Sequence, residues 1–265
     1  MSVIELIKER KSVRSYTGEP LNKELVDSIN NYIERLNPPF GAKARIRLIS
    51  AKTGEQPVKL GTYGVISGAT DFLLLIGEKG LMSEAGAGYM FEQAILFCTG
   101  LGLGTCWLGG TLKRGDFLTQ IRLSGDEELI VISPVGYKRE KRTLLDSIMR
   151  TGARSDKRKP FGSLFFNGTF EIPLTEADAG NYNTPLEMVR LAPSGSNKQP
   201  WRVVMKDGGF HFYYRTGRFS VNDIGIALCH FELTCNELGL NGHFERIADI
   251  SGSNDVEYIM SWITE

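Results

Sequence analysis

The sequence predicts an α+β protein whose two similar halves face each other around a pseudo-two-fold axis as an intramolecular dimer. An internal repeat carries this prediction: residues 86–103 align with 223–240 at a constant offset of 137, matching a Gly, a Cys and the sequence LGL. A weaker match at an offset of 155 aligns 35–49 with 190–204. The expected elements also follow in the same order in both halves. The alternative is two unrelated domains in which the LGL sequences match by chance.

The elements of each half begin with a helix, at 23–36 in the first half and 184–192 in the second. Two strands follow, rich in β-branched, leucine or aromatic residues: 45–50 and 71–77 in the first half, 201–206 and 210–215 in the second. A long central helix, which carries the stronger repeat, completes the common pattern. The first half adds a β-rich run, ELIVISPVGY, that ends in a sharp change to polar residues.

The connector between the halves is expected at 150–163, RTGARSDKRKPFGS, which is basic, contains glycines and lacks an apolar period. We therefore expect an amino-terminal half at 1–152 and a carboxy-terminal half at 153–265. A chain of 265 residues with 42% apolar residues is long enough for two small domains with a sizeable core.

Composition excludes several classes of protein. The 31 Lys and Arg residues equal the 31 Asp and Glu residues in number, so no overall charge favours nucleic acid or an anionic membrane as a partner. The most apolar stretch, 85–110, contains seven glycines and the polar pair Glu92 and Gln93, which indicates a buried helix rather than a membrane span. The cysteines lack CxxC spacing and the histidines lack an HExxH pattern, so no metal site is expected. The start of the chain has the apolar spacing of a helix face rather than of a signal peptide, and we expect a reduced, cytoplasmic protein.

A cluster of cations lies near the start of the chain, in the sequence RKSVR. In an extended segment, Arg10, Ser12 and Arg14 point to one side while Lys11 and Val13 point to the other. Two guanidinium groups and a hydroxyl can bind a dianionic phosphate through charge-assisted hydrogen bonds, each contributing about 1.5–3 kcal/mol when shielded. The alternative is a solvated helix C-terminus, where the macrodipole favours cations.

Two further segments can bring backbone polar groups close to a flat ligand. APSGSNKQPW, at 192–201, has small polar residues after a helix-ending Pro193, although a generic turn would also explain its Pro and Gly. GLGLGTCWLGG, at 100–110, is a helix exit onto glycines, where backbone N–H groups can face a ligand. It lacks the GxGxxG order of a dinucleotide fold, and the packing of a tight turn is the alternative explanation.

Together, these three segments resemble the FMN-dependent nitroreductase family, whose members typically carry an RxSxR stretch, a PSxxNxQPW loop and a helix that ends in GLGTCWxGG. RKSVR and GLGTCWLGG occur only in the first half, and PSGSNKQPW occurs only in the second. Family members are usually homodimers with FMN at the subunit interface, so this chain is similar to such a dimer fused into one polypeptide. The resemblance implies a nitroreductase-like fold, a single-chain functional monomer and one composite FMN site. The pseudo-symmetric mate of this site is expected to be lost, because the first half has PPFGAKARI where the flavin-facing loop should be and the second half begins without RxSxR.

The resemblance also assigns roles to residues of both halves. The expected FMN-binding residues are Arg10, Lys11, Ser12, Arg14, Leu108, Gly109, Gly110, Arg158, Pro193, Ser194, Gly195, Ser196 and Asn197. Among them, the arginines and serine of RKSVR would hold the phosphate, and the backbone of Leu108 and Gly109 would lie by the flavin N5. The PSGSN residues would contact the ring and the ribityl chain.

Arg158 is expected as a further phosphate cation, because family members often carry an RKP-like segment near the phosphate. Three other cations compete for this role: Lys138, Lys141 and Arg142.

The resemblance implies an FMN-dependent oxidoreductase that takes electrons from NADH or NADPH and passes them, two at a time, to a small acceptor in the same cavity. Nitroaromatics, quinones and free flavins are the acceptors that it implies, and the use of one cavity in turn predicts ping-pong kinetics. No catalytic side chain is required, because positive charge and a backbone N–H would stabilise the reduced flavin. The alternatives are a flavin-binding protein without turnover and a protein whose basic start binds a different phosphorylated ligand.

Overall fold

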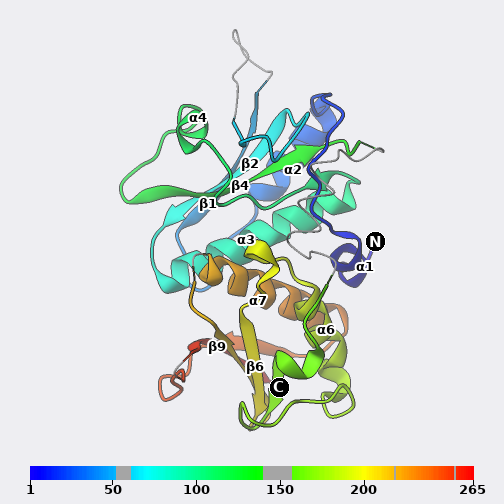
Figure 1. The fold of residues 1–265 in the computed structure, drawn as a ribbon, viewed down its shortest axis with the longest axis vertical. Coiled ribbons are helices and arrows are strands. Elements are labelled where there is room, and N and C mark those ends of the chain that lie inside the picture. Colours follow the sequence, from blue (N-terminus) through cyan, green and yellow to red (C-terminus); the bar gives the residue numbers. More distant parts are fainter. Residues whose placement is uncertain (52–60, 140–156, 218, 254) are drawn as a thin grey trace. The chain divides into compact units, whose positions relative to one another are not determined.

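The computed structural model describes residues 1–51, 61–139, 157–217, 219–253 and 255–265 of the chain. Its helices and strands form a mixed α+β structure with two sheets, as the sequence predicts (Figure 1). The seven helices and strands expected outside the repeated central helix are all present, with ends within three residues of the expected ones.

The chain divides into two compact units. The first unit comprises residues 9–153, and the second comprises 1–8 together with 154–265. The boundary that we expected, between 152 and 153, lies outside the described residues.

Helix α1, Val3–Glu9, differs from the expected division because residues 1–8 belong to the second unit. The carboxylate of Glu237 accepts hydrogen bonds from the backbone N–H groups of Val3 and Ile4. These N–H groups have no partner within the helix, so an acidic side chain from elsewhere in the second unit stabilises this helix N-terminus.

The first unit contains a four-stranded sheet in the order β1-β2-β4-β3, with antiparallel neighbours throughout. Its elements are α2 (Lys23–Ile33), β1 (Ala44–Ser50), β2 (Asp71–Glu78), α3 (Leu81–Gly100), β3 (Gly104–Thr105), α4 (Arg114–Leu118) and β4 (Glu127–Gly136). Helix α2 begins after Asn22, whose side-chain oxygen accepts a hydrogen bond from the Leu25 backbone N–H at 2.9 Å. Helix α3 buries residues on all sides, which is typical of a helix enclosed by a core.

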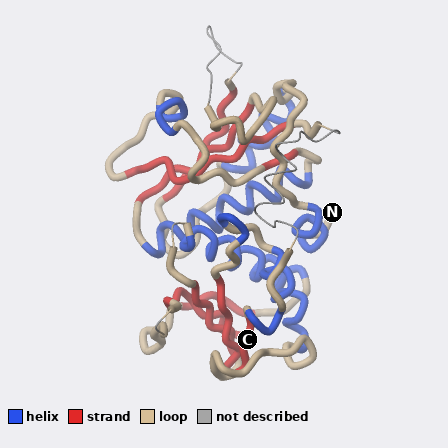
Figure 2. The backbone as a smooth tube through the Cα atoms, viewed as in Figure 1, coloured by secondary structure: helices blue, strands red, loops and turns tan. Residues whose placement is uncertain are grey.

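Both faces of the first sheet are covered. On β2, Leu73 and Leu75 pack towards α2 and α3, whereas Phe72 and Leu74 pack on the other face against Phe117 of α4. Successive residues of a strand point to opposite faces, so a strand covered on both sides requires a continuous apolar run. The run DFLLLIG provides it, and Figure 2 shows the helices of this unit beside its strands.

The second unit contains a five-stranded sheet in the order β5-β6-β7-β9-β8, in which only the β5–β6 pair is parallel. Its elements are β5 (Phe165–Asn167), α6 (Asn183–Leu191), β6 (Trp201–Lys206), β7 (Gly209–Tyr214), α7 (Ser220–Glu237), β8 (Gly242–Glu245) and β9 (Glu257–Thr264). Three short 3₁₀ turns lie at Phe161–Ser163, Gly180–Tyr182 and Gly195–Asn197. Between α7 and the sheet, Phe231 lies at the centre of an aromatic cluster with Phe212, Phe244 and Trp262.

The two units repeat one topology. In each, a helix, two strands, a long helix and two further strands follow in the same order, and the strands pair as β1-β2-β4-β3 and β6-β7-β9-β8. The connection between the first two strands is residues 51–70 in the first unit but only 207–208 in the second. This difference of 18 residues equals the fall in offset from 155 to 137, so both sequence matches belong to one repeat.

One sequence interpretation was wrong. We expected ELIVISPVGY to be an addition of the first half, but β9 occupies the same place in the second sheet as β4 does in the first. The β3–β4 connection contains residues 106–126 and the β8–β9 connection only 246–256. Because the second connection is ten residues shorter, β9 is displaced from the constant offset and the alignment does not reveal it.

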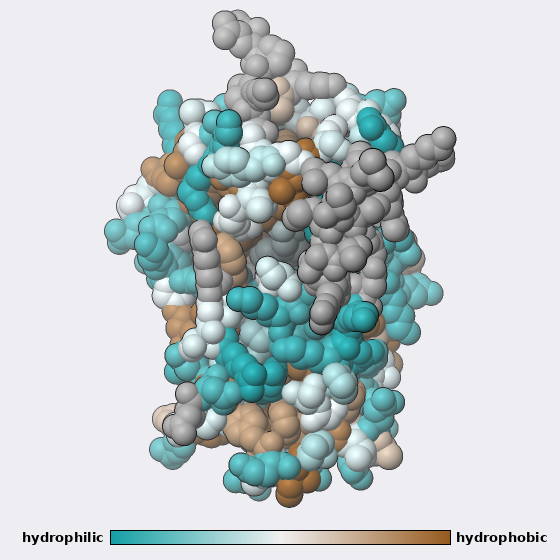
Figure 3. Space-filling model, in the orientation of Figure 1, coloured by the Kyte–Doolittle hydropathy of each residue, from teal (hydrophilic) through white to brown (hydrophobic). Residues whose placement is uncertain are grey.

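Among the described residues, no helix is both long enough and apolar enough to cross a membrane. On the face drawn in Figure 3, hydrophobic and hydrophilic residues are interspersed.

Candidate functional site

The RKSVR segment of the first unit lies beside strand β3. Ser12 forms a parallel β-bridge with Thr105, and the Val13 backbone N–H donates to the Thr105 carbonyl at 2.8 Å. A Cβ atom on Gly104 would lie 2.8 Å from Val13 Cγ1 and 2.9 Å from Val13 Cβ, so only glycine fits this approach. The cationic segment and the GTCWLGG segment, which are about 90 residues apart in the chain, therefore meet in one unit.

Glu92 joins these two segments to helix α3. Its side chain is fully buried, and its Oε2 accepts a hydrogen bond from Trp107 Nε1 at 2.8 Å. Its Oε1 lies 3.8 Å from Arg10 Nε, which is an ion-pair distance but too long for a hydrogen bond. Within the part of the chain that the structure describes, the buried Arg10 Nε has no hydrogen-bond partner. Glu92 thus balances the charge of Arg10, while the Arg10 Nε–H remains able to donate a hydrogen bond to a further anion.

The other polar residues of the segment differ in exposure. Lys11 is exposed and forms an ion pair with Glu9 at 3.5 Å, whereas Ser12 and Arg14 are half-buried. Lys138 lies 4.0 Å from the same Glu9 carboxylate. The two other competing cations, Lys141 and Arg142, lie outside the described residues.

The backbone beyond Trp107 offers fewer donors than the sequence predicts. The Leu108 N–H donates to the Ile132 carbonyl of β4 at 2.8 Å, and the Ile132 N–H donates back to Leu108 at 3.0 Å. The Leu108 N–H is therefore paired with β4, and the position of the Leu108 and Gly109 backbone beside a flavin stays a prediction. Gly109 and Gly110 follow the bridge, and their N–H groups have no hydrogen-bond partner among the described residues.

In the second unit, the PSGSN loop follows α6 and has an unusual backbone. Three residues that are not glycine adopt left-handed conformations: φ is 52° at Ser196, 54° at Asn197 and 48° at Gln199. Such conformations are strained for residues other than glycine, although asparagine tolerates them better, so the loop depends on hydrogen bonds to keep its shape. The Ser194 hydroxyl accepts the Gln199 N–H at 2.8 Å. Pro193 is half-buried and Ser196 is exposed.

Arg158 holds this loop from outside it. Arg158 Nη1 donates to Asn197 Oδ1 at 2.7 Å, and Nη2 donates to the Leu191 carbonyl at 3.0 Å. The Asn197 amide in turn donates to the Lys157 carbonyl at 2.8 Å. The structure therefore brings Arg158 together with Asn197 inside the second unit, where the arginine fixes the loop.

Further cations that the sequence reasoning missed lie under the same loop. Arg202 Nη1 and Lys159 Nζ both donate to the Gln199 carbonyl, at 3.1 and 3.4 Å. Burial and the charge of Arg215 lower the pKa of Arg202 to about 10. Burial is also the main cause of the lowered pKa of Lys159, with the charges of Arg202 and Arg215 contributing. The loop therefore rests on positively charged side chains, which favours anions nearby.

Asp223, at the start of α7, completes the support of the loop. Both carboxylate oxygens accept the Gly195 N–H, at 3.0 and 3.1 Å. Burial raises the pKa of this carboxyl to about 7, while the Gly195 N–H and the charge of Lys198 act in the opposite direction. The sequence signal for this role was an acidic residue in the first turn of a long helix, but its partner is 28 residues away.

Among the residues that the structure describes, no group of three His, Cys, Asp or Glu side chains could hold a metal ion. Free, buried thiols are present at Cys98, Cys106, Cys229 and Cys235.

Comparison with known proteins identifies the family. Residues 2–235 match the family described as "Putative TM nitroreductase". The chain belongs to this family. Its structure is similar to that of a protein from Thermotoga maritima described as a "putative nitroreductase", with a TM-score of 0.63, 24% identity, and coverage of 100% of this chain and 94% of that chain. At this identity, the likeness supports the nitroreductase fold, in agreement with the α+β prediction.

Two further nitroreductase structures match about half of this chain. A family protein from Clostridium difficile has a TM-score of 0.43 and 20% identity, and the match covers 57% of this chain and 92% of that chain. A nitroreductase with bound FMN from Bacteroides fragilis has a TM-score of 0.43 and 20% identity, over 54% of this chain and 92% of that chain. The comparison with curated proteins gave no match.

The buried pair of Arg10 and Glu92 predicts a strong effect on stability. Glu92→Gln keeps an acceptor for Trp107 but leaves Arg10 as an unbalanced buried charge, so we expect the free energy of unfolding to fall by about 3 kcal/mol. Arg10→Met added to Glu92→Gln should recover part of this loss, as measured by a double-mutant cycle in chemical denaturation. The control, Glu9→Gln at an exposed ion pair, should change stability by less than about 0.5 kcal/mol. Additive effects of the two buried substitutions would contradict the coupling.

The raised pKa of Asp223 predicts a pH dependence of stability. The folded protein holds this proton more tightly than the unfolded chain, so the group favours folding less as pH rises from its ordinary pKa of 3.8 to about 7. Asp223→Asn keeps an acceptor oxygen for Gly195 and removes the titration. The melting temperature of this variant, relative to wild type, should be higher at about pH 8 than at about pH 5. The exposed control Asp126→Asn should follow wild type at both pH values, and parallel curves for Asp223→Asn and wild type would refute the assignment.

Proposed function

We propose that this nitroreductase-family protein is an FMN-dependent NAD(P)H oxidoreductase that reduces small acceptors, such as nitroaromatics and quinones, by two electrons. The observation that carries the proposal is the meeting of RKSVR with GTCWLGG beside β3. There, a buried guanidinium nitrogen of Arg10 lacks a hydrogen bond and the N–H groups of Gly109 and Gly110 lack partners among the described residues. A guanidinium donor suits a phosphate group, and backbone N–H donors suit the polar edge of a ring, so these groups fit a ligand that carries both.

Each group of residues has a separate task in this proposal. Arg10, Ser12 and Arg14, with Lys11 at the exposed side, bind the FMN phosphate by charge-assisted hydrogen bonds. The Gly109 N–H replaces Leu108 as the donor to the flavin ring, because Leu108 is paired with β4.

The PSGSN loop of the second unit contributes the other side of one composite site. Its left-handed backbone and its bonds to Arg158 and Asp223 keep Pro193, Ser194 and Ser196 in a fixed arrangement for the ring and ribityl chain. Arg158 acts on the ligand through Asn197 as well as by its charge.

Bound FMN supplies hydride acceptance from NADH or NADPH and electron delivery to the second substrate. The chain's residues bind the phosphate, orient the ring and supply positive charge, and no side chain has to transfer a proton. One cavity that the two substrates occupy in turn gives ping-pong kinetics. We further propose that the single chain is the functional unit and that it acts in the cytoplasm, where its free cysteines remain reduced.

The first test is reduction of the bound flavin. Protein reconstituted with FMN should be yellow and should lose this colour on anaerobic stopped-flow mixing with NADH or NADPH. Addition of a quinone or nitroaromatic should restore the colour. A flavin that stays oxidised with both nicotinamides would contradict the enzyme and leave a flavin-binding protein, and a protein that binds no FMN would contradict the whole proposal.

The second test concerns the composite site. Arg14→Ala in the first unit and Asn197→Ala in the second should each weaken FMN binding by about 1–3 kcal/mol in a fluorescence titration. Lys23→Ala, at an exposed position of α2, is the matched control and should leave affinity unchanged. Melting temperatures separate a loss of binding from a loss of folding. If the substitution in only one unit reduced affinity, the composite site would be refuted.

A further inference from the structure

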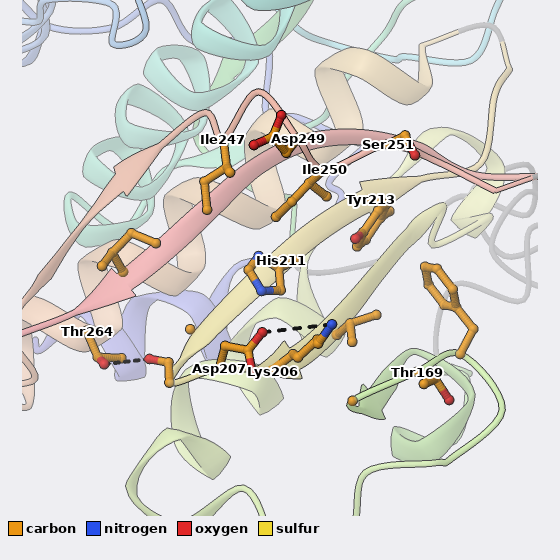
Figure 4. A pocket seen from close by; sticks show the side chains of 16 residues that line it. Thr169, Lys206, Asp207, His211, Tyr213, Ile247, Asp249, Ile250, Ser251 and Thr264 are labelled. Atoms are coloured by element: carbon orange, nitrogen blue, oxygen red, sulfur yellow. Dashed lines mark hydrogen bonds and ion pairs between the residues drawn. The ribbon is translucent and has the colours of Figure 1, made fainter.

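A cavity of about 620 Å³ lies within the second unit, apart from the residues proposed to bind FMN. The turn at 168–170 and the segment 247–251 border it, and strands β6, β7 and β9 contribute to its lining (Figure 4). Ligand pockets commonly have volumes of about 300–1,000 Å³ with apolar walls and a few convergent polar groups. The volume of this cavity lies in that range, and its lining combines six apolar or aromatic side chains with seven polar ones.

The internal repeat explains why a cavity exists on this sheet. In the first unit, α4 and its flanking residues cover the corresponding sheet face, with Leu112 and Phe117 packed against Phe72. In the second unit, the shorter connection 246–256 replaces that covering and contains no helix in its described residues. The face therefore keeps only a small apolar cluster, in which Ile250 and Phe170 pack against the strands. The sheet face that α4 covers in the first unit therefore borders a cavity in the second unit.

The lining residue His211 is linked to two buried side chains that are not part of the cavity lining, Ser261 and Tyr258. Tyr258 OH accepts the Ile247 N–H at 3.0 Å and lies 2.7 Å from Ser261 Oγ and 3.5 Å from the Glu245 carbonyl. Ser261 Oγ also lies 2.7 Å from His211 Nδ1, so His211 is held in place by a buried hydroxyl.

His211 brings no positive charge to the cavity. The side chain is buried, and burial lowers its pKa, so the ring is neutral near pH 7. The other charged lining groups are Lys206, Asp207 and Asp249, and Lys206 lies 3.8 Å from Asp207. Two carboxylates and one ammonium group leave an excess of negative charge.

The walls favour a flat ligand. Phe170 and Tyr213 meet edge to face, with ring centroids 5.0 Å apart at 72°. Ile250 lies beside Tyr213 and Asp249 in Figure 4. Aromatic walls with an edge-to-face arrangement offer a ring face for stacking, and a ring face also attracts cations.

We propose that this cavity is a second ligand site, which binds a planar aromatic molecule carrying an amino or amidine group. The aromatic part packs against Phe170, Tyr213 and Ile250, and the donor groups face the carboxylates of Asp207 and Asp249. The site does not depend on FMN, so it stands even if the proposed oxidoreductase activity fails.

A matched pair of probes tests the site and its charge preference. Benzamidine and benzoate have similar size and opposite charge, so the cavity should bind the first and reject the second. The protein labelled with ¹⁵N-histidine has three histidines, of which His211 lines the cavity. Benzamidine should shift the His211 signals saturably and leave those of His230 and His243 unchanged.

Substitutions at the rim locate the binding. Thr169→Trp, at an exposed lining position, should weaken benzamidine binding at least about tenfold, and Asp249→Asn should weaken it about threefold. Lys23→Trp on α2 is the control and should leave the titration unchanged. Equal binding of benzoate, no saturable shift of His211 up to about 10 mM benzamidine, or an unchanged titration in Thr169→Trp would each overturn the proposal.

Discussion

The candidate site of the first unit depends on one buried carboxylate. Glu92 lies in the middle of α3, where most of its neighbours along the helix are buried, and a buried carboxylate is costly unless it is paired and hydrogen-bonded. Arg10 and Trp107 meet this requirement from two segments that are far apart in the sequence. The pairing therefore fixes where the cationic segment and the glycine turn lie relative to the helix. Within the described ranges of the chain, it also leaves Arg10 Nε without a hydrogen-bond partner, which is the state that an arginine needs if it is to bind an anion.

Much of the fold could be predicted from the sequence, because the repeat and the strand composition are local or periodic signals. The long helix of each unit and strands β1, β2, β6 and β7 lie where the residues predicted them, whereas the short strand β5 was not predicted. Strand β9 was missed as a counterpart of β4, since a change in loop length destroys an alignment at constant offset without changing how strands pair. The association of 1–8 with the second unit also lacks a sequence signal, because it depends on the Glu237 side chain at the far end of α7.

The residue types of the site could be predicted, but their partners could not. RKSVR indicates an anion site by its charges alone, yet the pairing of Leu108 with Ile132 is a tertiary contact that removes one of the predicted donors. Arg158 was expected to act as a phosphate cation, which stays a prediction, and the structure shows that it bonds Asn197, 39 residues away. Hydrogen bonds between distant segments decide which donors remain available, and no local pattern records them.

The repeat also gives a physical reason for the difference between the two halves. Position 86 in α3 corresponds to position 223 in α7, but the first is a glycine without a side chain and the second is an aspartate. A Cβ on Gly86 would lie 2.4 Å from the Pro39 carbonyl oxygen, so the PPFG turn of the first unit closes directly onto its helix. Asp223 instead extends a carboxylate that holds the Gly195 N–H, and the PSGSN loop is supported from its edge. A homodimer would carry every substitution twice. In a single chain, the PPFG turn can pack onto its helix while the PSGSN loop keeps a different shape, because the two sequences can change independently.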